Sequence, residues 1–453
     1  MNGYEAKLKN KSNKGWIRKI DSISLEEVNS SIAIPPENAS FLRKLLAFMG
    51  PGALVAVGYV DPGNWATSIE SGSKFGYTLL SVILIASLIA TLMQEMAARL
   101  GIATDMDLAQ ATSASVGKKL SFFLWILTEL AIIATDIAEV IGSAIALKLL
   151  FNIPILLGVA ITTLDVLLLL LLQKRSFRII ESIIIVLMTT IFIIFAYEIF
   201  LSNPNTKELI AGYLPSSEIV TNPSMLFLGL GILGATVMPH NLYLHSSIIQ
   251  TRVYERTEKG KKEAVKFARI DSVFSLTIAF LINSMILILG ASAFYGNGQV
   301  VSGIEEAYAL LAPTIGASIA STLFAIALLA SGQNSTITGT LSGQIVMEGF
   351  IHLKVKPWVR RIITRLLAVI PVFIVTIIAG ENGTVDLLIS SQVILSMQLP
   401  FALIPLVLLT SNEHKMGSFV NPTWVKIVAW VATVIIIFLN IYLVVYTLAE
   451  NVG

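Results

Sequence analysis

Two short stretches decide the fold: Val60-Asp61-Pro62-Gly63-Asn64 and Val237-Met238-Pro239-His240-Asn241, each inside an otherwise apolar run of membrane length. Proline removes a backbone donor, and the glycine of the first stretch widens the range of dihedral angles, so a regular helix is interrupted at both places. In hydrocarbon such a break is tolerated only where it is buried against protein or lines a cavity. One break alone is explained by a simple proline kink. Two at corresponding positions of two halves predict a transporter binding site near the middle of the membrane.

The composition is that of a helical membrane protein. Hydrophobic residues make up 55% of the 453 residues, charged residues 13%, and the mean hydropathy is +0.80. A soluble chain of this length could not carry such a composition on its surface. The chain has no cysteine, which excludes disulfides and thiolate metal sites and leaves methionine or histidine as the only soft ligands. The loops are short, so we expect no soluble catalytic domain.

The hydrophobic pattern predicts eleven spans of about 20 residues, each long enough for a hydrocarbon core of ~30 Å. The first, Leu45–Gly72, and the sixth, Met225–Ile249, carry the breaks. The others are Thr78–Ala98, Leu120–Leu147, Ile153–Leu172, Ile179–Leu201, Ile270–Phe294, Ile315–Gly349, Ile362–Ala379, Val385–Leu409 and Trp424–Leu448. Because five spans precede the second break, residues 45–201 and 224–409 are expected to form an inverted 5+5 repeat of the LeuT-like kind, followed by an eleventh helix at 422–449.

The cations predict the orientation. With the N-terminus inside, only Lys74, Lys148 and Lys207 of the 31 Lys and Arg residues fall on the outer side, as the positive-inside rule requires. We therefore expect a multi-pass protein of the cell membrane with a cytoplasmic N-terminus and an extracellular C-terminus. Residues 1–44 form a polar tail in which Ser24-Leu25-Glu26-Glu27 fits a capping box and predicts a short surface helix. We interpret this tail as solvated and without chemistry of its own, contact with anionic lipid being the alternative.

The residues at the breaks suit a transition-metal ion. Asp61 offers an anionic oxygen, Asn64 a carbonyl oxygen and Met238 a polarisable thioether, and the interrupted helices free backbone carbonyls near Gly58 and Ala235. Oxygen ligands alone suit Mg²⁺ and Ca²⁺, whereas an added sulfur favours first-row transition metals. The alternative for Met238 is simple packing in the core.

A row of acids lies in the predicted third span. Glu129, Asp136 and Glu139 fall within an arc of about 80° on one helical face. Three carboxylates inside a membrane are costly unless they line water or pair with cations. Such a row is typical of proton relays, and the alternative is a structural network of ion pairs.

Two histidines follow the second break. His240 titrates near neutral pH and is a candidate for passing a proton between Asp61 and the acid row, or else a structural hydrogen-bonding group. His245, five residues on, faces away from His240, so the pair does not chelate a metal. Other acids of the spans, expected to pair with cations or face interfacial water, are Glu95, Asp165 and Glu181. The Gly-, Ser- and Thr-rich segment 333–349 serves either close helix packing or the permeation path.

These motifs resemble one known family. Asp-Pro-Gly-Asn at 61–64, Met-Pro-His-Asn followed by Leu-Tyr-Leu-His-Ser at 238–246, and the segments Gly-Gln-Asn-Ser-Thr at 332–336 and Gly-Gln-Ile-Val-Met-Glu-Gly at 343–349 are similar to the Nramp family of divalent metal transporters. The resemblance runs from about Leu45 to Leu409. It implies proton-coupled import of Mn²⁺ or Fe²⁺, as in the bacterial manganese importers.

The resemblance also implies roles for individual residues. The implied metal ligands are Asp61, Asn64, the Ala235 carbonyl and Met238, joined in some states by Gln392 and Asn283. A buried amide is often only an interhelical hydrogen bond, which is the alternative for the last two. The implied proton exit is the acid row with two arginines of the ninth span: Glu129, Asp136, Glu139, Arg360 and Arg361. We expect no resident cofactor, a divalent ion and protons as substrates, the lipid bilayer as surroundings, no nucleic-acid partner, and function as a monomer.

Three other functions are compatible with the chain to different degrees. A sodium-coupled amino-acid or organic-solute symporter could share the fold, but it would place glycines and helix N-termini for a carboxylate. The sequence lacks the ligands that a membrane metalloenzyme would need, because it has only 4 histidines and no His-Glu-x-x-His motif. A receptor or metal sensor without transport remains open, although two broken helices indicate moving parts.

Overall fold

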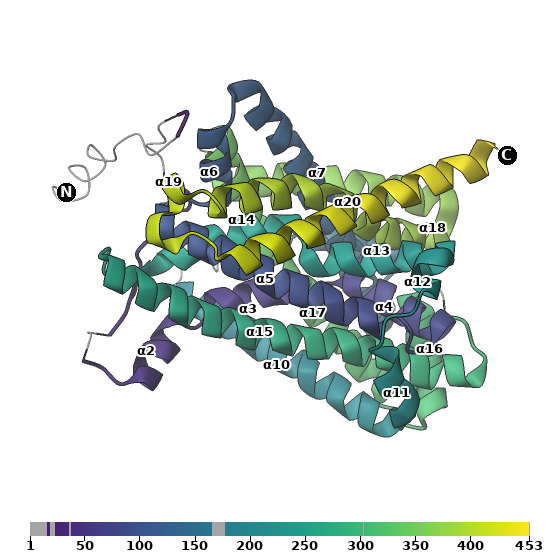
Figure 1. The fold of residues 1–453 in the computed structure, drawn as a ribbon. Helices are drawn as coiled ribbons and strands as arrows, with labels where there is room; N and C mark the ends of the chain where they lie inside the picture. The colour runs from purple at the N-terminus through teal and green to yellow at the C-terminus, as the bar shows by residue number, and fades with distance from the viewer. Residues whose placement is uncertain are drawn as a thin grey trace.

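Long helices lying side by side make up the protein (Figure 1). The structure is a computed structural model that describes residues 16–18, 23–35, 38–164, 177–301, 303–353 and 355–452. The helices of the first half are α2 (Phe41–Phe48), α3 (Pro51–Gly58), α4 (Pro62–Phe75), α5 (Leu80–Thr104), α6 (Leu108–Ser115), α7 (Lys118–Phe151), α8 (Ile155–Thr162), α10 (Phe177–Ser202), α11 (Thr206–Gly212) and α12 (Glu218–Thr221). Those of the second half are α13 (Pro223–Val237), α14 (Pro239–Ile248), α15 (Glu258–Ala293), α16 (Ile304–Ile315), α17 (Ala320–Phe350), α18 (Pro357–Thr410), α19 (Glu413–Met416) and α20 (Thr423–Val452).

Short elements connect these helices. Three single turns of 3-10 helix are η1 (Ile249–Thr251), η2 (Tyr295–Asn297) and η3 (Gly417–Phe419). The two strands, β1 (Ile32–Ala33) and β2 (Arg252–Val253), pair in parallel. In Figure 1, α2, α6 and α19 lie at one end of the bundle, and α11, α12 and α16 lie at the other.

The helices agree with the predicted spans over the described residues. Eight of them are long and apolar enough to cross a membrane, or nine if the bent pair α2 and α3 counts as one span. The first predicted span corresponds to α3 and α4, which are each too short for this criterion, and the eighth to α17, whose Ser- and Thr-rich sequence lowers its hydropathy. The fourth begins with α8 and continues, with Asp165, outside the described residues.

The two breaks form where the sequence predicts them. Helix α3 ends at Gly58, and α4 restarts with Pro62 at its first position and Asp61 as its N-cap. Helix α13 ends at Val237, and α14 restarts with Pro239 after Met238, whose φ is 32°. A proline at the first position of a helix needs no hydrogen-bond acceptor, so each proline begins a new helix instead of continuing the old one.

Helix α18 contains the ninth and tenth predicted spans. Its 54 residues include a single non-helical residue, Gly380, with φ 68° and ψ −158°. This left-handed conformation favours glycine, and it separates two segments that are each long enough to cross a membrane, Trp358–Gly380 and Gly383–Thr410.

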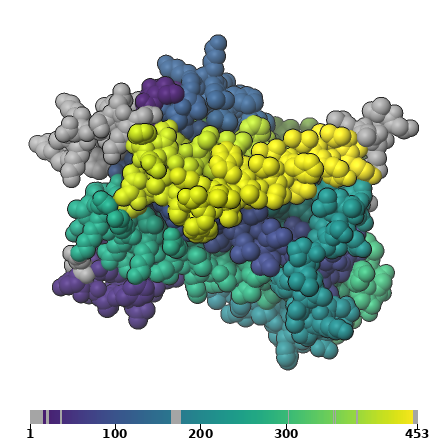
Figure 2. All heavy atoms as spheres, in the orientation of Figure 1, coloured from purple at the N-terminus to yellow at the C-terminus, as the bar shows by residue number. Residues whose placement is uncertain are grey.

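Packing around α7 and α4 places the breaks inside the bundle. Helix α7 packs mainly on α17 and α18, and α4 packs mainly on α15. The fully buried Trp65 of α4 lies against Phe195 of α10 and Phe324 of α17, with ring centroids 4.7 and 5.2 Å away. Helix α20 lies along the outside of the bundle, where it contacts α18, α13 and α5 (Figure 2).

The N-terminal segment differs from the prediction. Residues 24–30 form turns, and Leu25 has a φ of 51°, so the predicted surface helix is wrong. Leu25 and Ile32 are buried at 5% and 7% exposure, and β1 pairs with β2. The described part of the tail is therefore docked on the helices rather than solvated, because its apolar residues find partners more than 200 residues away along the chain.

Candidate metal and proton sites

Asp61 begins α4 and is fully buried. Its Oδ1 accepts hydrogen bonds from the Asn64 backbone N–H at 2.9 Å and from Asn64 Nδ2 at 2.7 Å. Its Oδ2 has no hydrogen-bond partner in the described part of the protein. A buried carboxylate oxygen without a donor is expensive, and a cation is the partner that would relieve the cost.

The second break meets the first through Asn64. The Nδ2 of Asn64 also donates to the Ala235 carbonyl, at 2.9 Å, and the Thr236 hydroxyl faces Asn64 Oδ1 at 3.4 Å. The amide N–H₂ of Asn64 thus lies between an anionic oxygen and a backbone carbonyl. A metal ion bound to these two oxygens would replace this donor, and rotation of the Asn64 amide would then present its carbonyl oxygen instead.

Met238 is the residue at the second break itself. It is fully buried, and its sulfur lies 3.4 Å from Asn241 Nδ2, which is also 3.4 Å from the Val55 carbonyl in α3. Asn241 therefore connects the sulfur to the first broken helix. A positive φ at a non-glycine residue costs on the order of 1–3 kcal/mol, so the surrounding packing must hold Met238 in place.

Two amides border the first break. Asn283 of α15 donates from Nδ2 to the Tyr59 carbonyl at 2.7 Å. Gln392 of α18 lies against Gly63 so closely that a Cβ at Gly63 would overlap its carboxamide. The Oδ1 of Asn283 and the Oε1 of Gln392 are buried acceptors that, within the described residues, have no hydrogen-bond partner. Both amides can therefore offer an oxygen to a cation. Each also contacts another helical segment, Asn283 at Tyr59 and Gln392 at Gly63.

The acid row of α7 faces three arginines of α18. Arg360 contacts both oxygens of Glu129 at 2.9 and 3.0 Å, and Arg361 contacts Asp136 at 2.8 Å. Glu139 lies 3.5 Å from Arg361 and 3.6 Å from Arg365. All of these groups except Glu129 and Arg360 are at most 2% exposed. Every acid of the row thus has a cationic partner, which is what makes three carboxylates tolerable at this depth.

His240 follows the second break and contacts the helix that carries the acid row. It is the second residue of α14, and its Nδ1 lies 3.4 Å from the hydroxyl of Thr135, the residue before Asp136. Its Nε2 has no hydrogen-bond partner in the part of the chain that the structure covers. His245 instead contacts Gln94 at 3.0 Å and Ser272 at 3.4 Å, so the two histidines do not share a site.

The residues that converge at the breaks are of mixed chemical type. No group of three or more His, Cys, Asp or Glu residues able to hold a metal occurs among the described residues. A metal ion at the breaks would be held by a mixed set of one carboxylate, neutral oxygens and a thioether. Such a set suits an ion that has to leave again.

Comparison with known proteins decides the family. Residues 52–446 match the model of the natural resistance-associated macrophage protein-like family, Nramp. The chain belongs to the Nramp family. It is similar to a divalent metal cation transporter, MntH, of Listeria monocytogenes serotype 4a (strain HCC23), with 64% identity over 441 residues covering 97% of this chain and 98% of the relative. This Nramp chain is therefore a transporter and not an enzyme.

Solved structures agree with the family and define the fold. The manganese transporter of Eremococcus coleocola is 46% identical, with a TM-score of 0.88 over 95% of this chain and 92% of the other. The transporter MhsT matches with a TM-score of 0.57 at 18% identity, over 86% of this chain and 98% of the other. The Nramp chain thus has the LeuT-like inverted-repeat fold, with α20 as the additional helix.

Sequence reasoning missed three residues of this Nramp site. Arg365 lies one turn beyond Arg361 and reaches Glu139, and its i, i+4 spacing from Arg361 was the available signal. Thr336 of α17 donates to Glu139 at 3.0 Å, so the small-residue segment does contact the acid row in addition to packing closely. Asn241, part of the quoted motif, contacts Met238.

Two of the three further acids singled out in the sequence, Glu95 and Glu181, are paired with cations as predicted, and the third, Asp165, lies outside the described residues. Glu95 contacts Arg269 at 2.5 Å and also Arg99, and Glu181 contacts Arg252 at 2.8 Å and Arg178 at 3.2 Å. These acids therefore fix helices to one another at the end of the bundle that carries α2.

Proposed function

We propose that this Nramp chain imports divalent transition-metal ions, Mn²⁺ or Fe²⁺, together with protons. The observation that carries the proposal is a set of three buried acceptor oxygens around the first break: Asp61 Oδ2, Asn283 Oδ1 and Gln392 Oε1 lack hydrogen-bond donors among the described residues. Buried acceptors are nearly always satisfied, so acceptors left open beside a carboxylate favour a cationic substrate. The names of the relatives, a divalent metal cation transporter and a manganese transporter, support the same substrate class.

The arrangement suggests how one ion is held. Asp61 supplies the charge, the Ala235 carbonyl and a rotated Asn64 amide supply neutral oxygens, and Met238 supplies the sulfur that disfavours Ca²⁺ and Mg²⁺. Asn283 and Gln392 would complete the shell as the ion loses water. Because Asp61, Asn64, Ala235 and Met238 are at most 1% exposed, transport requires the broken helices to move and open the site to each side in turn.

The proton is assigned to a separate route. His240 contacts Thr135 beside the acid row, and the row of Glu129, Asp136 and Glu139 follows α7 along its arginine partners. A proton that leaves the region of Asp61 can thus pass to groups whose charge is already compensated. We assign the chain to the cell membrane as a functional monomer, with the N-terminus and the strongly cationic loops in the cytoplasm.

The decisive experiment is Mn²⁺ flux into proteoliposomes with and without an inward-directed proton gradient. We expect uptake that the gradient accelerates and that Asp61→Ala abolishes. The matched control is Glu70→Gln, because Glu70 lies further along the same helix and pairs with Lys74 instead of facing the break. Uptake that follows a sodium gradient, or flux that persists in Asp61→Ala, would contradict the proposal.

A further inference from the structure

The end of the bundle near α2, α6 and α19 is a docking surface for the chain's own N-terminal segment (Figure 1). We call residues 16–18 and 23–35 the N-terminal strap. We propose that the strap, seated on α6, α17 and β2, holds this side of the transporter closed and must detach before the site opens toward it. This inference rests on the transport function proposed above.

The strap first attaches to α6. The backbone N–H groups of Ile17 and Arg18 both donate to the Ala114 carbonyl, at 2.8 and 3.0 Å. The Lys415 ammonium, from α19, lies 4.5 Å from the centroid of the Trp16 ring. These are contacts to the backbone and to a cation, so they fix the position of this segment without burying much apolar surface.

The second attachment is to the end of α17. The Leu25 N–H donates to Glu348 Oε2 at 3.0 Å, and the other carboxylate oxygen accepts from Gln344 at 2.9 Å. The Leu25 side chain is 5% exposed and belongs to the main hydrophobic core. A buried hydrogen bond to a charged group is among the stronger ones, so Leu25 is the strap's firmest point.

The third attachment is to the segment that follows the second broken span. The Ser30 N–H donates to the Gln250 carbonyl at 3.0 Å, and Ile32 pairs with Arg252 in the two-stranded sheet. The Arg252 side chain in turn donates to the Met49 carbonyl at 2.7 Å. Through β2 the strap is therefore connected to the start of α3, the first half of the other broken span.

These attachments join two groups of helices that must separate when the site opens toward this end. Residues 51–58 of α3 are all buried, packed against α10, α14, α15 and α17. Opening this end requires α3 and α14 to move away from α17 and its neighbours, because the broken helices are the elements that expose the site. The strap ties β2, which follows α14 and η1 in the chain, to Glu348 of α17. Its release therefore precedes or accompanies the separation.

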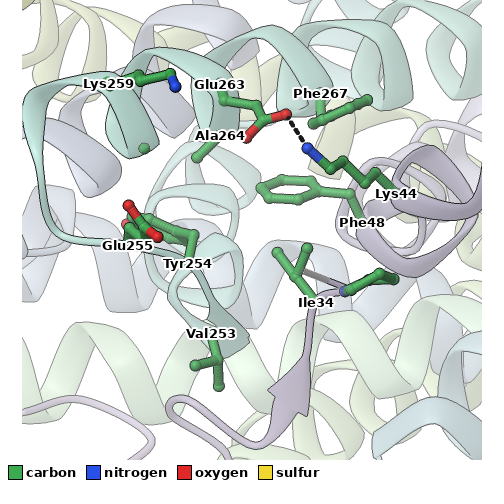
Figure 3. A pocket seen from close by; sticks show the side chains of 12 residues that line it. Ile34, Lys44, Phe48, Val253, Tyr254, Glu255, Lys259, Glu263, Ala264 and Phe267 are labelled. Carbon is green, nitrogen blue, oxygen red and sulfur yellow. Dashed lines mark hydrogen bonds and ion pairs between the residues drawn. The ribbon is translucent and has the colours of Figure 1, made fainter. Parts of the chain in front are cut away.

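The strap is loosely packed where it leads into α2. A cavity of about 250 Å³ is lined by Ile34, Phe48 and Phe267, with the Lys44–Glu263 ion pair at 2.8 Å beside it (Figure 3). Protein interiors are normally close-packed, so this end of the strap holds the helices less tightly than Leu25 does. Detachment from this end leaves Leu25 and Glu348 as the last contact to break.

The absence of native cysteine allows a direct test. The reporter is a single cysteine introduced into α3, Ala53→Cys. The native Ala53 side chain is 7% exposed. In proteoliposomes, a membrane-impermeant maleimide added to the side that carries the strap should react slowly with this cysteine.

Two variants release the strap. Leu25→Pro removes the N–H donor and cannot adopt the φ of 51°, and Glu348→Ala removes the acceptor. Each should raise the labelling rate about tenfold, the loss expected for one hydrogen bond to a charged group. The double variant should add little to either.

The control is Glu27→Ala, an exposed residue of the same turn, which should label like the reporter alone. Leu25→Pro lies outside every helix, so it is interpretable even if Glu348→Ala folds poorly. Unchanged or slower labelling in Leu25→Pro would overturn the inference. Labelling does not depend on transport, so the two proposals can fail separately. Faster labelling of the variants without Mn²⁺ uptake would support the role of the strap and contradict the transport function. Proton-driven uptake with unchanged labelling would support the transport function and contradict the role of the strap.

Discussion

The candidate metal site and the acid row are both buried and both contain carboxylates, yet their charges are compensated in opposite ways. Asp61 has hydrogen bonds on one oxygen and no ion pair among the described residues. Asp136 and Glu139, some 75 residues along the chain, face Arg361 and Arg365. An acid left without a cation can take one from outside, whereas an acid already paired with arginine has less to offer a metal ion. Under the proposed function, this difference would keep the metal ion and the proton on separate groups.

The largest expected effect comes from removing the uncompensated charge. Asp61→Asn keeps the size of the side chain and its capping ability, but it removes the only formal charge at the breaks. We expect Mn²⁺ affinity to fall at least about a hundredfold, since the remaining ligands are neutral. Isothermal titration of the purified protein measures this directly. Affinity within about threefold of the wild type would mean that the charge for the ion comes from elsewhere.

The second change removes a compensated acid. Asp136→Asn leaves Arg361 with Glu139 alone, and breaking a buried ion pair of this kind costs about 3 kcal/mol of unfolding free energy. We expect Mn²⁺ still to enter while the accompanying acidification of the liposome interior is lost. A pH-sensitive dye trapped inside reports the proton and a metal-sensitive dye reports the ion. An intact proton signal in this variant would assign the acid row to structure alone.

Met238→Ala tests the selectivity of the site. Loss of the thioether should weaken Mn²⁺ binding about tenfold, because one of several ligands is removed, and should let Ca²⁺ or Mg²⁺ compete. The measurement is Ca²⁺ competition against Mn²⁺ uptake in proteoliposomes. If the Ca²⁺-to-Mn²⁺ discrimination ratio stays the same, Met238 is a packing residue.

The smallest expected effect concerns Asp107, a buried acid that belongs to neither the candidate metal site nor the acid row. Asp107 caps α6, outside the spans, and burial raises its pKa to about 6, with the negative charge of Glu348 adding to the shift and hydrogen bonds opposing it. Because the folded state holds this proton more tightly than the unfolded chain, the free energy of unfolding should fall by about 1 kcal/mol between pH 5 and pH 7.5.

Asp107→Asn should remove this pH-dependent component, since asparagine caps a helix equally well without titrating. Thermal unfolding of the two proteins at pH 5 and pH 7.5 provides the comparison. An identical pH dependence in both would show that Asp107 is ionised in the folded state.

The breaks and the acid row could be predicted because they depend on local chemistry. Proline fixes where each helix restarts, and the 100° rotation per residue places Glu129, Asp136 and Glu139 on one face whatever surrounds them. The spans followed from hydropathy in the same way. Their partners could not be predicted, because which residues face the row depends on how α18 is rotated against α7. Arg365 was missed for that reason.

The docked strap was missed because its stability comes from distant residues. Nothing in the sequence of residues 16–35 predicts a partner for the Leu25 N–H, which is Glu348, 323 positions away. The capping-box pattern at Ser24 predicted a helix from local preference alone, and tertiary contacts with α17 and β2 override that preference. Local rules thus fail where a polar segment is stabilised by the surface of other helices.

The single left-handed residue at Gly380 has a mechanical consequence. It joins the arginines, at one end of α18, to Gln392 in the other half of the same element without an intervening flexible loop. Two helices joined by one residue are coupled in position, so under the proposed function a displacement of the arginines on proton arrival would also shift the amide beside Gly63. Cargo and driving ion would then be linked through one continuous element, although they share no ligand.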